Sequence, residues 1–441
     1  DNNFIISNNI WGMNQDNGVD LGGADYNIIQ YNRIHHQQQN GIHFLGSPAC
    51  NQISRNAIYS NDQSGLWIDS NLDTANYNMI SFNNIWGLNQ DHGLYINNAD
   101  YTVVSSNRIH HNRTNGIWIV GSAFSNAFRK NAVYSNNRYG LFLDSDTGDN
   151  NLIISNIVYG LNQKTGIRIL DGDDTIVYRN LIYRNETNAF MAGGSSLSTR
   201  FFNNTVFGCL ADGLVFDNTS GATLYNNIIL SNGSASGDYG VDAPTTGVVL
   251  LSHNLLFGNY AGRTNSGLDW GPANITNTPL LDTVTSFTIT SAFSPAVDSA
   301  TNIPGVSDSY MGSGPDMGWK ESPFTYGIVT ITSNPPPEIP EAPEPVYDNL
   351  DNVKVAPNPF KKNDPEGPDH VVFFYLTPEF DIKIYSVTGA MVSHIQGSSK
   401  SGRFNWYVKN EKGEALKPGV YICYVTNSKG QKKTLKLVVI N

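Results

Sequence analysis

The chain has 441 residues, of which 39% are hydrophobic and 15% are charged, and its formal net charge is −11. This length predicts more than one domain, and the acidic balance argues against a nucleic-acid partner, whose phosphates need a basic surface. The sequence lacks an apolar run of about 18 residues, so no membrane-spanning helix is expected. Cys50, Cys209 and Cys423 are too few and too scattered for a disulfide framework or a zinc site.

A short unit repeats along most of the chain. An asparagine, a variable residue and an apolar residue recur in steps of 23 to 27 residues, with the asparagine at positions 8, 32, 56, 83, 107, 131, 156, 180, 204, 227 and 254. Short runs of alternating apolar and polar residues lie between Gly, Asn and Asp, which is typical of strands and tight turns. A period in the twenties without helical periodicity predicts a solenoid. The leucine spacing of a leucine-rich repeat is missing, so we predict a parallel β-helix.

The predicted β-helix has about 11 coils and covers residues 1–271. Because the asparagines share one phase, we expect them to form an internal ladder in which each side-chain amide bonds the next coil's amide. Two segments, "NRIHHQQQNGIHFLGS" from Asn32 and "NRIHHNRTNGIWIVGS" from Asn107, start 75 residues apart, which is three coils. The simplest account is duplication of a three-coil block.

Three further regions follow the coils. Residues 272–331, with "NTPLLD", "SPAVDSA" and "GPDMGWKE", are expected to close the solenoid, and residues 332–349 form a Pro-rich, acidic linker. Residues 350–441 contain "VAPNPF", "FDIKIYSVTGAMV" and "PGVYICYV", in which apolar and polar residues alternate between turns. This pattern predicts a small antiparallel Ig-like β-sandwich, so the whole chain is expected to be all-β.

The coils and the closing segment resemble the secreted right-handed parallel β-helix repeat superfamily, which includes pectate-lyase-like enzymes. This resemblance implies a right-handed solenoid and leaves the activity open, because many functions share the scaffold. The motifs "PNPF", "IYSVTG" and "PGVY" make residues 350–441 similar to C-terminal sorting or Ig-like modules of secreted bacterial proteins, related to type IX secretion and flagellar-hook-capping modules. That resemblance implies export and surface attachment.

Two rows of outward-facing side chains are expected on the coils. Within Asn-x-Ile-x the isoleucine points inward, so the next residue points out, and the variable residue of Gly-Ile-x-Ile also points out. The first row contains Trp11, His35, Tyr59, Trp86, His110 and Tyr134. The second contains Trp67, Tyr95, Trp118 and Phe142. Such rings can stabilise neighbouring coils, stack on sugars or anchor a protein contact.

Some polar residues could carry chemistry. His35 and His110, with His36, His111, Arg33 and Arg108, could supply the acid, base and carboxylate recognition of a polysaccharide lyase. Repeated polar residues are more often inherited surface decoration, and two catalytic centres on one face would be unusual. We therefore expect no catalytic residues.

Carboxylates cluster at two predicted turns. "DSDTGD", with Asp144, Asp146 and Asp149, resembles calcium loops with alternating aspartates, so calcium is the one cofactor considered. "DGDD", with Asp171, Asp173 and Asp174, resembles the paired aspartates of polysaccharide hydrolases. The companion "GHG" and "RIK" motifs are absent, and Asx-rich turns are ordinary in solenoids.

These features favour an exported bacterial protein, extracellular or on the cell surface, that is structural or adhesive and presents its aromatic rows to polysaccharide or to like subunits. The alternative is a polysaccharide lyase or glycosidase acting on an acidic polysaccharide. The first residues, "DNNFIISNN", match "DNNLIISNI" at Asp149, so we expect the chain to start at a coil boundary, as a processed form or a fragment. We also expect its first coil to lie against a neighbouring subunit, giving head-to-tail association into a homopolymer.

Overall fold

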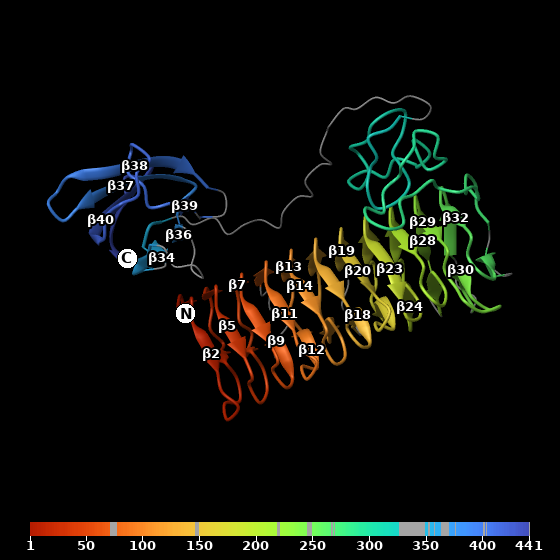
Figure 1. Cartoon of the computed structure of the whole chain (residues 1–441), viewed down its shortest axis with the longest axis horizontal. Helices are drawn as coiled ribbons and strands as arrows, with labels where there is room; N and C mark the ends of the chain where they lie inside the picture. The colour runs from red at the N-terminus through yellow and green to blue at the C-terminus, as the bar shows by residue number, and fades with distance from the viewer. Residues whose placement is uncertain are drawn as a thin grey trace. The chain divides into compact units, whose positions relative to one another are not determined.

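The computed structural model describes residues 1–70, 77–145, 150–217, 221–244, 249–265, 268, 270–325, 349–351, 353–356, 358–362, 370–374, 376–399, 402 and 404–440. These residues form strands, turns and loops and contain no helix. Accordingly, this part of the chain holds no helix that could cross a membrane. The residues fall into two compact units, the coils with their closing segment and the C-terminal strands (Figure 1).

Each coil contributes one short strand to each of three parallel, 11-stranded sheets. Sheet A contains β1 (Phe4–Ile6), β4 (Ile28–Gln30), β7 (Gln52–Ser54), β10 (Met79–Ser81), β13 (Val103–Ser105), β16 (Ala127–Arg129), β19 (Leu152–Ile154), β22 (Ile176–Tyr178), β25 (Arg200–Phe202), β28 (Ala222–Tyr225) and β31 (Val249–Ser252). Sheet B contains β2 (Asn9–Trp11), β5 (Arg33–His35), β8 (Ala57–Tyr59), β11 (Asn84–Trp86), β14 (Arg108–His110), β17 (Ala132–Tyr134), β20 (Ile157–Gly160), β23 (Leu181–Asn185), β26 (Thr205–Phe207), β29 (Ile228–Leu230) and β32 (Leu255–Phe257). Sheet C contains β3 (Val19–Gly22), β6 (Ile42–Leu45), β9 (Ser64–Asp69), β12 (His92–Asn97), β15 (Ile117–Val120), β18 (Tyr139–Asp144), β21 (Thr165–Leu170), β24 (Phe190–Gly193), β27 (Leu214–Phe216), β30 (Tyr239–Asp242) and β33 (Gly262–Thr264).

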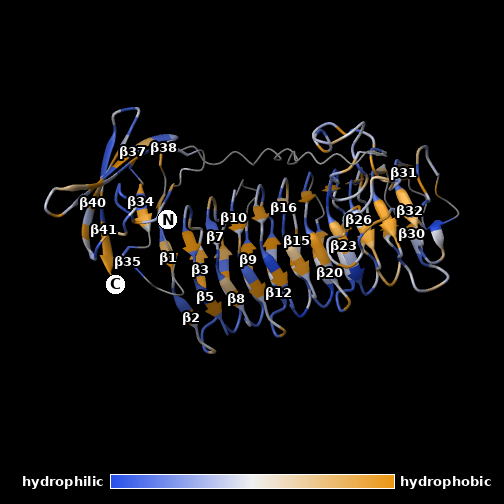
Figure 2. Cartoon of the chain, turned by 45° about the horizontal axis from the view of Figure 1, so that its top comes forward, coloured by the Kyte–Doolittle hydropathy of each residue, from blue (hydrophilic) through white to orange (hydrophobic). Residues whose placement is uncertain are grey.

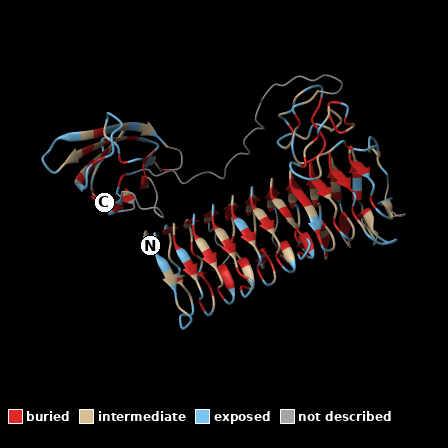
Figure 3. Ribbon diagram, in the orientation of Figure 1, coloured by how far each residue is buried: buried red, intermediate tan, exposed pale blue. Residues whose placement is uncertain are grey.

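Like residues stack in register between coils. In sheet B, Ile34 pairs with Ile58, and Ile85 pairs with Ile58 and Ile109. These side chains are completely buried and belong to one hydrophobic cluster that runs through the coils. Buried residues recur along the strands of successive coils (Figure 3), and hydrophobic residues recur in the same strands (Figure 2). The predicted parallel β-helix, with its inward-pointing isoleucines, is confirmed.

Sheets A and B meet at a corner with the same chemistry in every coil. The residue before the ladder asparagine has a positive φ, a left-handed conformation that turns the chain sharply. These residues are Ser7, Tyr31, Arg55, Phe82, Ser106, Lys130, Ser155, Arg179, Asn203, Asn226 and His253. The asparagine that follows then bonds to the coils above and below it. Asn83 Nδ2, for example, donates to Asn107 Oδ1 at 3.0 Å and to the carbonyl of Ile53 at 2.8 Å.

The predicted asparagine ladder is confirmed from Asn32 onward, whereas Asn8 of the first coil, which the prediction included, is exposed. Amide-to-amide hydrogen bonds of 2.9–3.1 Å run without a break from Asn32 to Asn254 and end on Asn274. Asn56, Asn83, Asn107 and Asn131 are almost completely buried. Each Oδ1 also accepts a backbone N–H of the preceding coil, as when Asn83 N donates to Asn107 Oδ1 at 2.9 Å. The corner therefore leaves no polar group of these side chains unsatisfied, which a buried amide requires.

Another ladder, not expected from the sequence, follows sheet B. It mixes residue types: Gln90 Nε2 donates to Asn112 Oδ1 at 2.8 Å, and Asn112 Nδ2 donates to Asn136 Oδ1 at 2.8 Å. Cys209 occupies one position of this ladder. Asn185 Nδ2 lies 3.6 Å from Cys209 Sγ, a much weaker partner than an amide oxygen.

The glycines before the sheet C strands are required by close packing. A Cβ at Gly93 would overlap Cγ2 of Ile109 and lie 2.5 Å from the carbonyl oxygen of Gly116. The glycine row therefore lets the backbone of sheet C approach the inward residues of sheet B.

The closing segment packs on the outer side of the last coils. Gly318 N donates to Asn226 O at 2.7 Å, and Asn226 Nδ2 donates to Thr301 O at 2.8 Å. Trp319 N donates to Thr205 Oγ1 at 3.1 Å. Met317 of this segment shares a buried cluster with Leu230 of sheet B. Residues 326–331 and the predicted linker up to residue 348 lie outside the described residues.

The C-terminal unit has two sheets around one hydrophobic core. The smaller contains β34 (Lys354–Ala356), β36 (Val371–Phe374) and β39 (Phe404–Trp406). The larger contains β35 (Phe360–Lys361), β41 (Lys432–Ile440), β40 (Gly419–Asn427), β37 (Glu379–Ser386) and β38 (Met391–Ser398). All pairs are antiparallel except β35 with β41. The predicted small antiparallel domain is confirmed, whereas its Ig-like or sorting role and the boundaries at 271, 331 and 349 stay predictions.

Replacing Asn107 by Leu should lower the free energy of unfolding by about 1–3 kcal/mol, because the amides of Asn83 and Asn131 lose buried partners. Urea unfolding of the purified chain measures the change. Asn137→Leu is the control, because Asn137 is exposed. Equal stability of the Asn107 variant and the parent protein would contradict the energetic role of the ladder.

Replacing Cys209 by Asn should raise the unfolding free energy by about 1 kcal/mol, because the new amide restores hydrogen bonds to Asn185 and Asn232. Cys209 is buried, so the substitution acts inside the ladder. Cys209→Ser, whose hydroxyl does not extend as far, should show no such gain. A lower melting temperature for Cys209→Asn than for the parent protein would show that this position has adapted to sulfur.

Candidate functional site

The third residues of the sheet B strands form a row on the outside of the solenoid, called here the sheet B row. From the first coil to the last it contains Trp11, His35, Tyr59, Trp86, His110, Tyr134, Tyr159, Tyr183, Phe207, Leu230 and Phe257. From His35 to Tyr183 successive rings are parallel, with centroids 4.5–5.8 Å apart and interplanar angles of at most 12°. Phe287 of the closing segment meets Tyr183 at 4.4 Å.

This stacking decides which surface of the rings is available. The faces from Tyr59 to Tyr159 lie against neighbouring rings, so their edges and polar atoms are what a partner can reach. Flat stacking of a sugar on a ring requires a free face. Trp11 differs, because 64% of its surface is exposed. The geometry therefore favours mutual stabilisation of the coils by the stacked rings, with recognition restricted to the edges.

A polar group recurs beside the stack, once in each of the first two three-coil blocks. His35 Nε2 lies 3.1 Å from Asn9 Oδ1, and His35 Nδ1 lies 2.7 Å from His36 Nδ1. Arg33 Nη2 donates to the Tyr59 hydroxyl at 3.1 Å. In the second block the corresponding distances for His110 are 3.0 Å to Asn84 Oδ1 and 2.9 Å to His111 Nδ1. Arg108 Nη2 donates to the Tyr134 hydroxyl at 2.8 Å.

The hydrogen bonds assign the tautomers. An amide oxygen only accepts, so Nε2 of His110 carries the hydrogen that faces Asn84, and its Nδ1 is an acceptor when the ring is neutral. His111 must then donate from Nδ1. Burial lowers the pKa of His110 to about 4, helped by His111 and Arg108. Burial also lowers the pKa of His35, helped by His36 and Arg33. Both rings are therefore neutral at neutral pH.

The structure thus brings together the arginines and histidines that the sequence singled out, and adds Asn9, Asn84, Tyr59 and Tyr134. The asparagines were missed. They begin their strands in the segments "NNIWG", which occur once in each block, so the duplication contained the information needed to find them. The Nδ1 acceptor of His110 is engaged by His111, so the apo arrangement does not hold a free base directed at a substrate.

The outward residues of sheet C form a second row, called here the sheet C row. It contains Asp20, His43, Trp67, Tyr95, Trp118, Phe142, Arg168 and Met191. Its rings are tilted or edge-on up to Trp118, with 52° between Trp67 and Tyr95 and 81° between Tyr95 and Trp118, whereas Trp118 and Phe142 are nearly parallel at 11°. Phe142 is only 6% exposed and its ring contacts those of Tyr139 and Trp118, so it offers little surface to a partner, and the binding role of the row stays a prediction.

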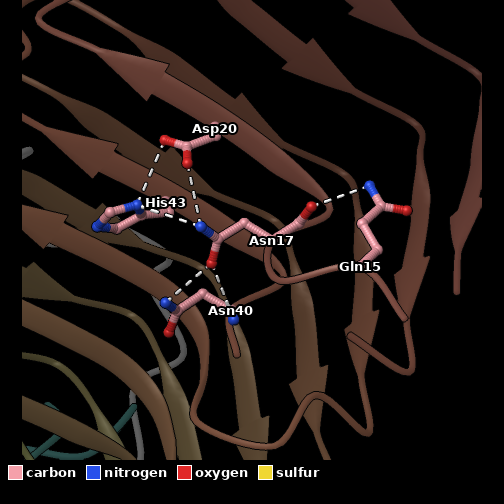
Figure 4. A network of polar contacts seen from close by, with 5 residues as sticks. All are labelled: Gln15, Asn17, Asp20, Asn40 and His43. Carbon is pink, nitrogen blue, oxygen red and sulfur yellow. Dashed lines mark hydrogen bonds and ion pairs between the residues drawn. The ribbon is translucent and has the colours of Figure 1, made fainter. Parts of the chain in front are cut away.

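Polar residues occupy the other end of the sheet C row (Figure 4). His43 Nδ1 lies 3.3 Å from Asp20 Oδ1, and Asn17 Nδ2 donates to Asp20 Oδ2 at 3.1 Å. Asn17 Oδ1 accepts from Asn40 Nδ2 at 3.1 Å, and Gln15 Nε2 donates to the carbonyl of Asn17 at 2.9 Å. The network joins neighbouring coils by side-chain hydrogen bonds at the surface, as the asparagine ladder does inside the solenoid.

His92 was not singled out from the sequence, yet it lies beneath the sheet C row. Its ring is 4.9 Å from that of Trp118 and 5.9 Å from that of Tyr95. The Thr114 hydroxyl donates its hydrogen to the carbonyl of Asp91 at 2.6 Å, so Thr114 Oγ1 accepts from Nδ1–H of His92 at 2.8 Å. Burial lowers its pKa to about 4, with Arg113 and Arg138 acting in the same direction and Asp91 opposing them.

The two predictions that concern carboxylates, a hydrolytic pair and a calcium site, have different outcomes. Asp171 Oδ1 accepts the backbone N–H of Ser195 at 2.5 Å, and Asp173 Oδ1 accepts that of Leu197 at 2.7 Å. These aspartates therefore tie one coil to the next, and a role as a hydrolytic pair is not favoured. Asp144 ends β18, whereas Asp146 and Asp149 lie outside the described residues, so the calcium site stays a prediction. Within the described residues no group of three or more His, Cys, Asp or Glu could hold a metal ion.

Three parallel sheets, in-register coils and asparagine corners place the molecule among the parallel β-helix proteins. The family described as "Right handed beta helix region" matches residues 1–151 and 125–270, and the chain belongs to this family. The predicted right-handed solenoid is thereby confirmed. No curated protein matches the sequence.

Several solved structures are similar. Pectate lyase Pel9A is 15% identical over 72% of this chain and 87% of its own, with a TM-score of 0.49. The periplasmic alginate epimerase AlgG is 16% identical over 57% and 77%, with a TM-score of 0.38. The GH87 α-1,3-glucanase of Streptomyces thermodiastaticus is 14% identical over 62% and 64%, with a TM-score of 0.46. PorZ of the Porphyromonas gingivalis type-IX secretion system is 28% identical over 21% of this chain and only 12% of PorZ, with a TM-score of 0.19.

The contribution of His92 to the free energy of unfolding should fall as the pH is lowered from 7 to 5, because the unfolded chain protonates His92 near pH 6.5 and the folded chain only near pH 4. This contribution is about 1–2 kcal/mol. Burial raises the pKa of Glu321, Asp316 and Asp212, which acts in the opposite sense, so the contribution is measured as the difference between the parent protein and His92→Gln in urea unfolding at both pH values. His394→Gln, in the C-terminal unit, is the control. An unchanged slope in His92→Gln would show that His92 protonates freely in the folded protein.

Proposed function

We propose that this chain is an exported bacterial β-helix protein, extracellular or surface-attached, with a structural or adhesive rather than a catalytic role. Its solenoid presents the edges of the sheet B row, and the exposed part of the sheet C row, to polysaccharide or to like subunits. The observation that carries this proposal is the continuous parallel stack from His35 to Tyr183, along which the same kinds of donor recur.

A stack of this kind suits a repetitive partner. The hydroxyls of Tyr59 and Tyr134, each bonded by an arginine, recur at the same place in two coils that are three coils apart. That spacing is about 14 Å, since strands in a sheet are about 4.8 Å apart. A linear polymer can contact both places at once, and two weak contacts on one chain reinforce each other. Stacked rings also lose little conformational entropy on binding.

Export is supported by the sequence of the C-terminal unit. The segments "PNPF", "IYSVTG" and "PGVY" resemble bacterial sorting modules, and the strands that contain them fold into a unit of their own. Head-to-tail association of like subunits is a further part of the proposal, and sedimentation of the purified chain at high concentration measures it.

A polysaccharide lyase or glycosidase acting on an acidic polymer is the second candidate. The observation in its favour is the duplicated group of an arginine, two histidines and a tyrosine. Against it, the histidine pair is bonded to itself and both arginines are engaged by tyrosine hydroxyls. The duplication also places two equivalent groups on one face, where a lyase needs a single centre.

One experiment separates the two candidates. The purified chain is incubated with pectin, alginate and a neutral glucan, and both retention on the immobilised polymer and release of unsaturated uronate or reducing ends are followed. We expect retention without turnover. Arg33→Ala with Arg108→Ala should weaken retention on the acidic polymers about tenfold or more, because each lost charged hydrogen bond is worth about 1.5–3 kcal/mol.

Arg129→Ala is the matched control, because Arg129 lies at the end of β16 in sheet A. Turnover that disappears in His110→Ala would establish the enzyme instead. Absence of both retention and turnover on every polymer would leave like subunits as the partner, which the sedimentation measurement then decides.

A further inference from the structure

The two histidine pairs have a geometry that the proposed function does not use. In each pair, consecutive residues direct their Nδ1 atoms at one another, His35 toward His36 at 2.7 Å and His110 toward His111 at 2.9 Å. The second histidine of each pair is exposed, whereas the first is only partly exposed. The geometry points to two binding sites for a divalent transition-metal ion of the copper(II) class, one in each three-coil block.

The short distance between the nitrogens suits one ion held by both. The exposed second ring must turn so that both Nδ1 lone pairs meet at the ion. If the nitrogens then stay 2.7–2.9 Å apart, metal–nitrogen bonds of about 2.0–2.1 Å subtend about 80–90° at the ion, whereas a tetrahedral ion needs the nitrogens about 3.3 Å apart. Neighbouring positions about 90° apart are those of tetragonal copper(II) and nickel(II). Imidazole nitrogen is a favoured donor for both ions, and copper(II) binds such donors more tightly. Water would complete the coordination.

A hydrogen bond and ring packing fix the orientation of the first histidine of each pair. Metal-binding histidines commonly direct their other ring nitrogen at a carbonyl or carboxylate oxygen, which sets the tautomer and the ring plane. Asn84 Oδ1 does this for His110 at 3.0 Å, and Asn9 Oδ1 does it for His35 at 3.1 Å. Trp86 and Tyr134 pack on either face of the His110 ring, with interplanar angles of 8° and 9°.

The second histidine can release its Nδ1 hydrogen. His36 and His111 have φ values of 58° and 55°, which place them at a tight corner with the side chain facing its neighbour. In the metal-free pair, the second ring donates from Nδ1. When an ion binds, this hydrogen moves to Nε2 of the same exposed ring, so both Nδ1 lone pairs bind the ion and the net proton count is unchanged.

The nearby arginines make it possible to distinguish a cation site from an anion site. Arg108 Nη2 is bonded to the Tyr134 hydroxyl at 2.8 Å and places a positive charge near the pair. That charge opposes a metal cation and would favour a carboxylate. Removing it should therefore tighten metal binding, whereas it would weaken an anion site.

The experiment titrates the full chain with Cu²⁺, Ni²⁺, Zn²⁺ or Ca²⁺ in separate calorimetric runs. We expect about two Cu²⁺ ions per chain, weaker Ni²⁺ and Zn²⁺ binding and no Ca²⁺ binding at these sites. His36→Ala or His111→Ala should remove one ion, and the double variant both. These side chains are exposed, so the melting temperature should stay close to that of the parent protein. His394→Ala, in the C-terminal unit, is the matched control.

Electron paramagnetic resonance distinguishes the pairs from adventitious binding to scattered histidines. Ions at both pairs would lie about 14 Å apart, three coil spacings, and should broaden each other's spectrum. Either single variant should abolish this broadening. Arg108→Ala should tighten Cu²⁺ binding by about threefold or more, because it removes a like charge.

Unchanged stoichiometry in the double variant would overturn the assignment, and so would two ions without mutual broadening. Weaker Cu²⁺ binding in Arg108→Ala would also overturn it and would favour an anion site. None of these outcomes depends on whether the chain binds polysaccharide, so the two proposals succeed or fail separately.

Discussion

A buried asparagine amide at the corner between sheets A and B is the interaction on which the coils depend. The residue before it takes a left-handed conformation, which turns the chain but would leave backbone groups without partners inside the solenoid. The asparagine side chain supplies those partners, as when Asn107 accepts the N–H of Asn83 and donates to the carbonyl of Ile80. The hydrogen bonds that satisfy each amide therefore also satisfy polar groups of the neighbouring coils. These shared bonds keep the coils in one register.

The surface rows follow from that register. Because coils repeat at the spacing of strands in a sheet, about 4.8 Å, equivalent side chains stand at nearly the separation that stacked rings prefer. The centroids of Tyr134 and Tyr159 are 4.9 Å apart and nearly parallel. In sheet C, Tyr95 and Trp118 are 5.0 Å apart but almost perpendicular, and His92 packs against both. One coil spacing therefore produces a flat strip on one face and an uneven surface on another.

The sequence predicted the parts of this structure that repeat with one kind of residue. The ladder from Asn32 to Asn254 could be read directly, because asparagine stands at the same phase in every coil. The inward row of sheet B could also be read, because every coil has an aliphatic residue there, most often isoleucine. The ladder after sheet B was missed because its positions alternate between Gln, Asn and Cys, so no single letter marks it. The contact between His110 and His111 was also beyond prediction, since it depends on ring orientation at a left-handed corner.

The duplicated three-coil block affects how the length of such a protein can evolve. Each block begins and ends in the same phase of the coil, so a further copy can enter the stack without disturbing the packing on either side of it. Every insertion would lengthen the stack by about 14 Å and add another arginine–histidine–tyrosine group, while Phe287 and the closing segment would still cover the last coils. The length of the solenoid could therefore change by one block at a time, through recombination between nearly identical stretches of gene. The packing of the core would be kept in each such step.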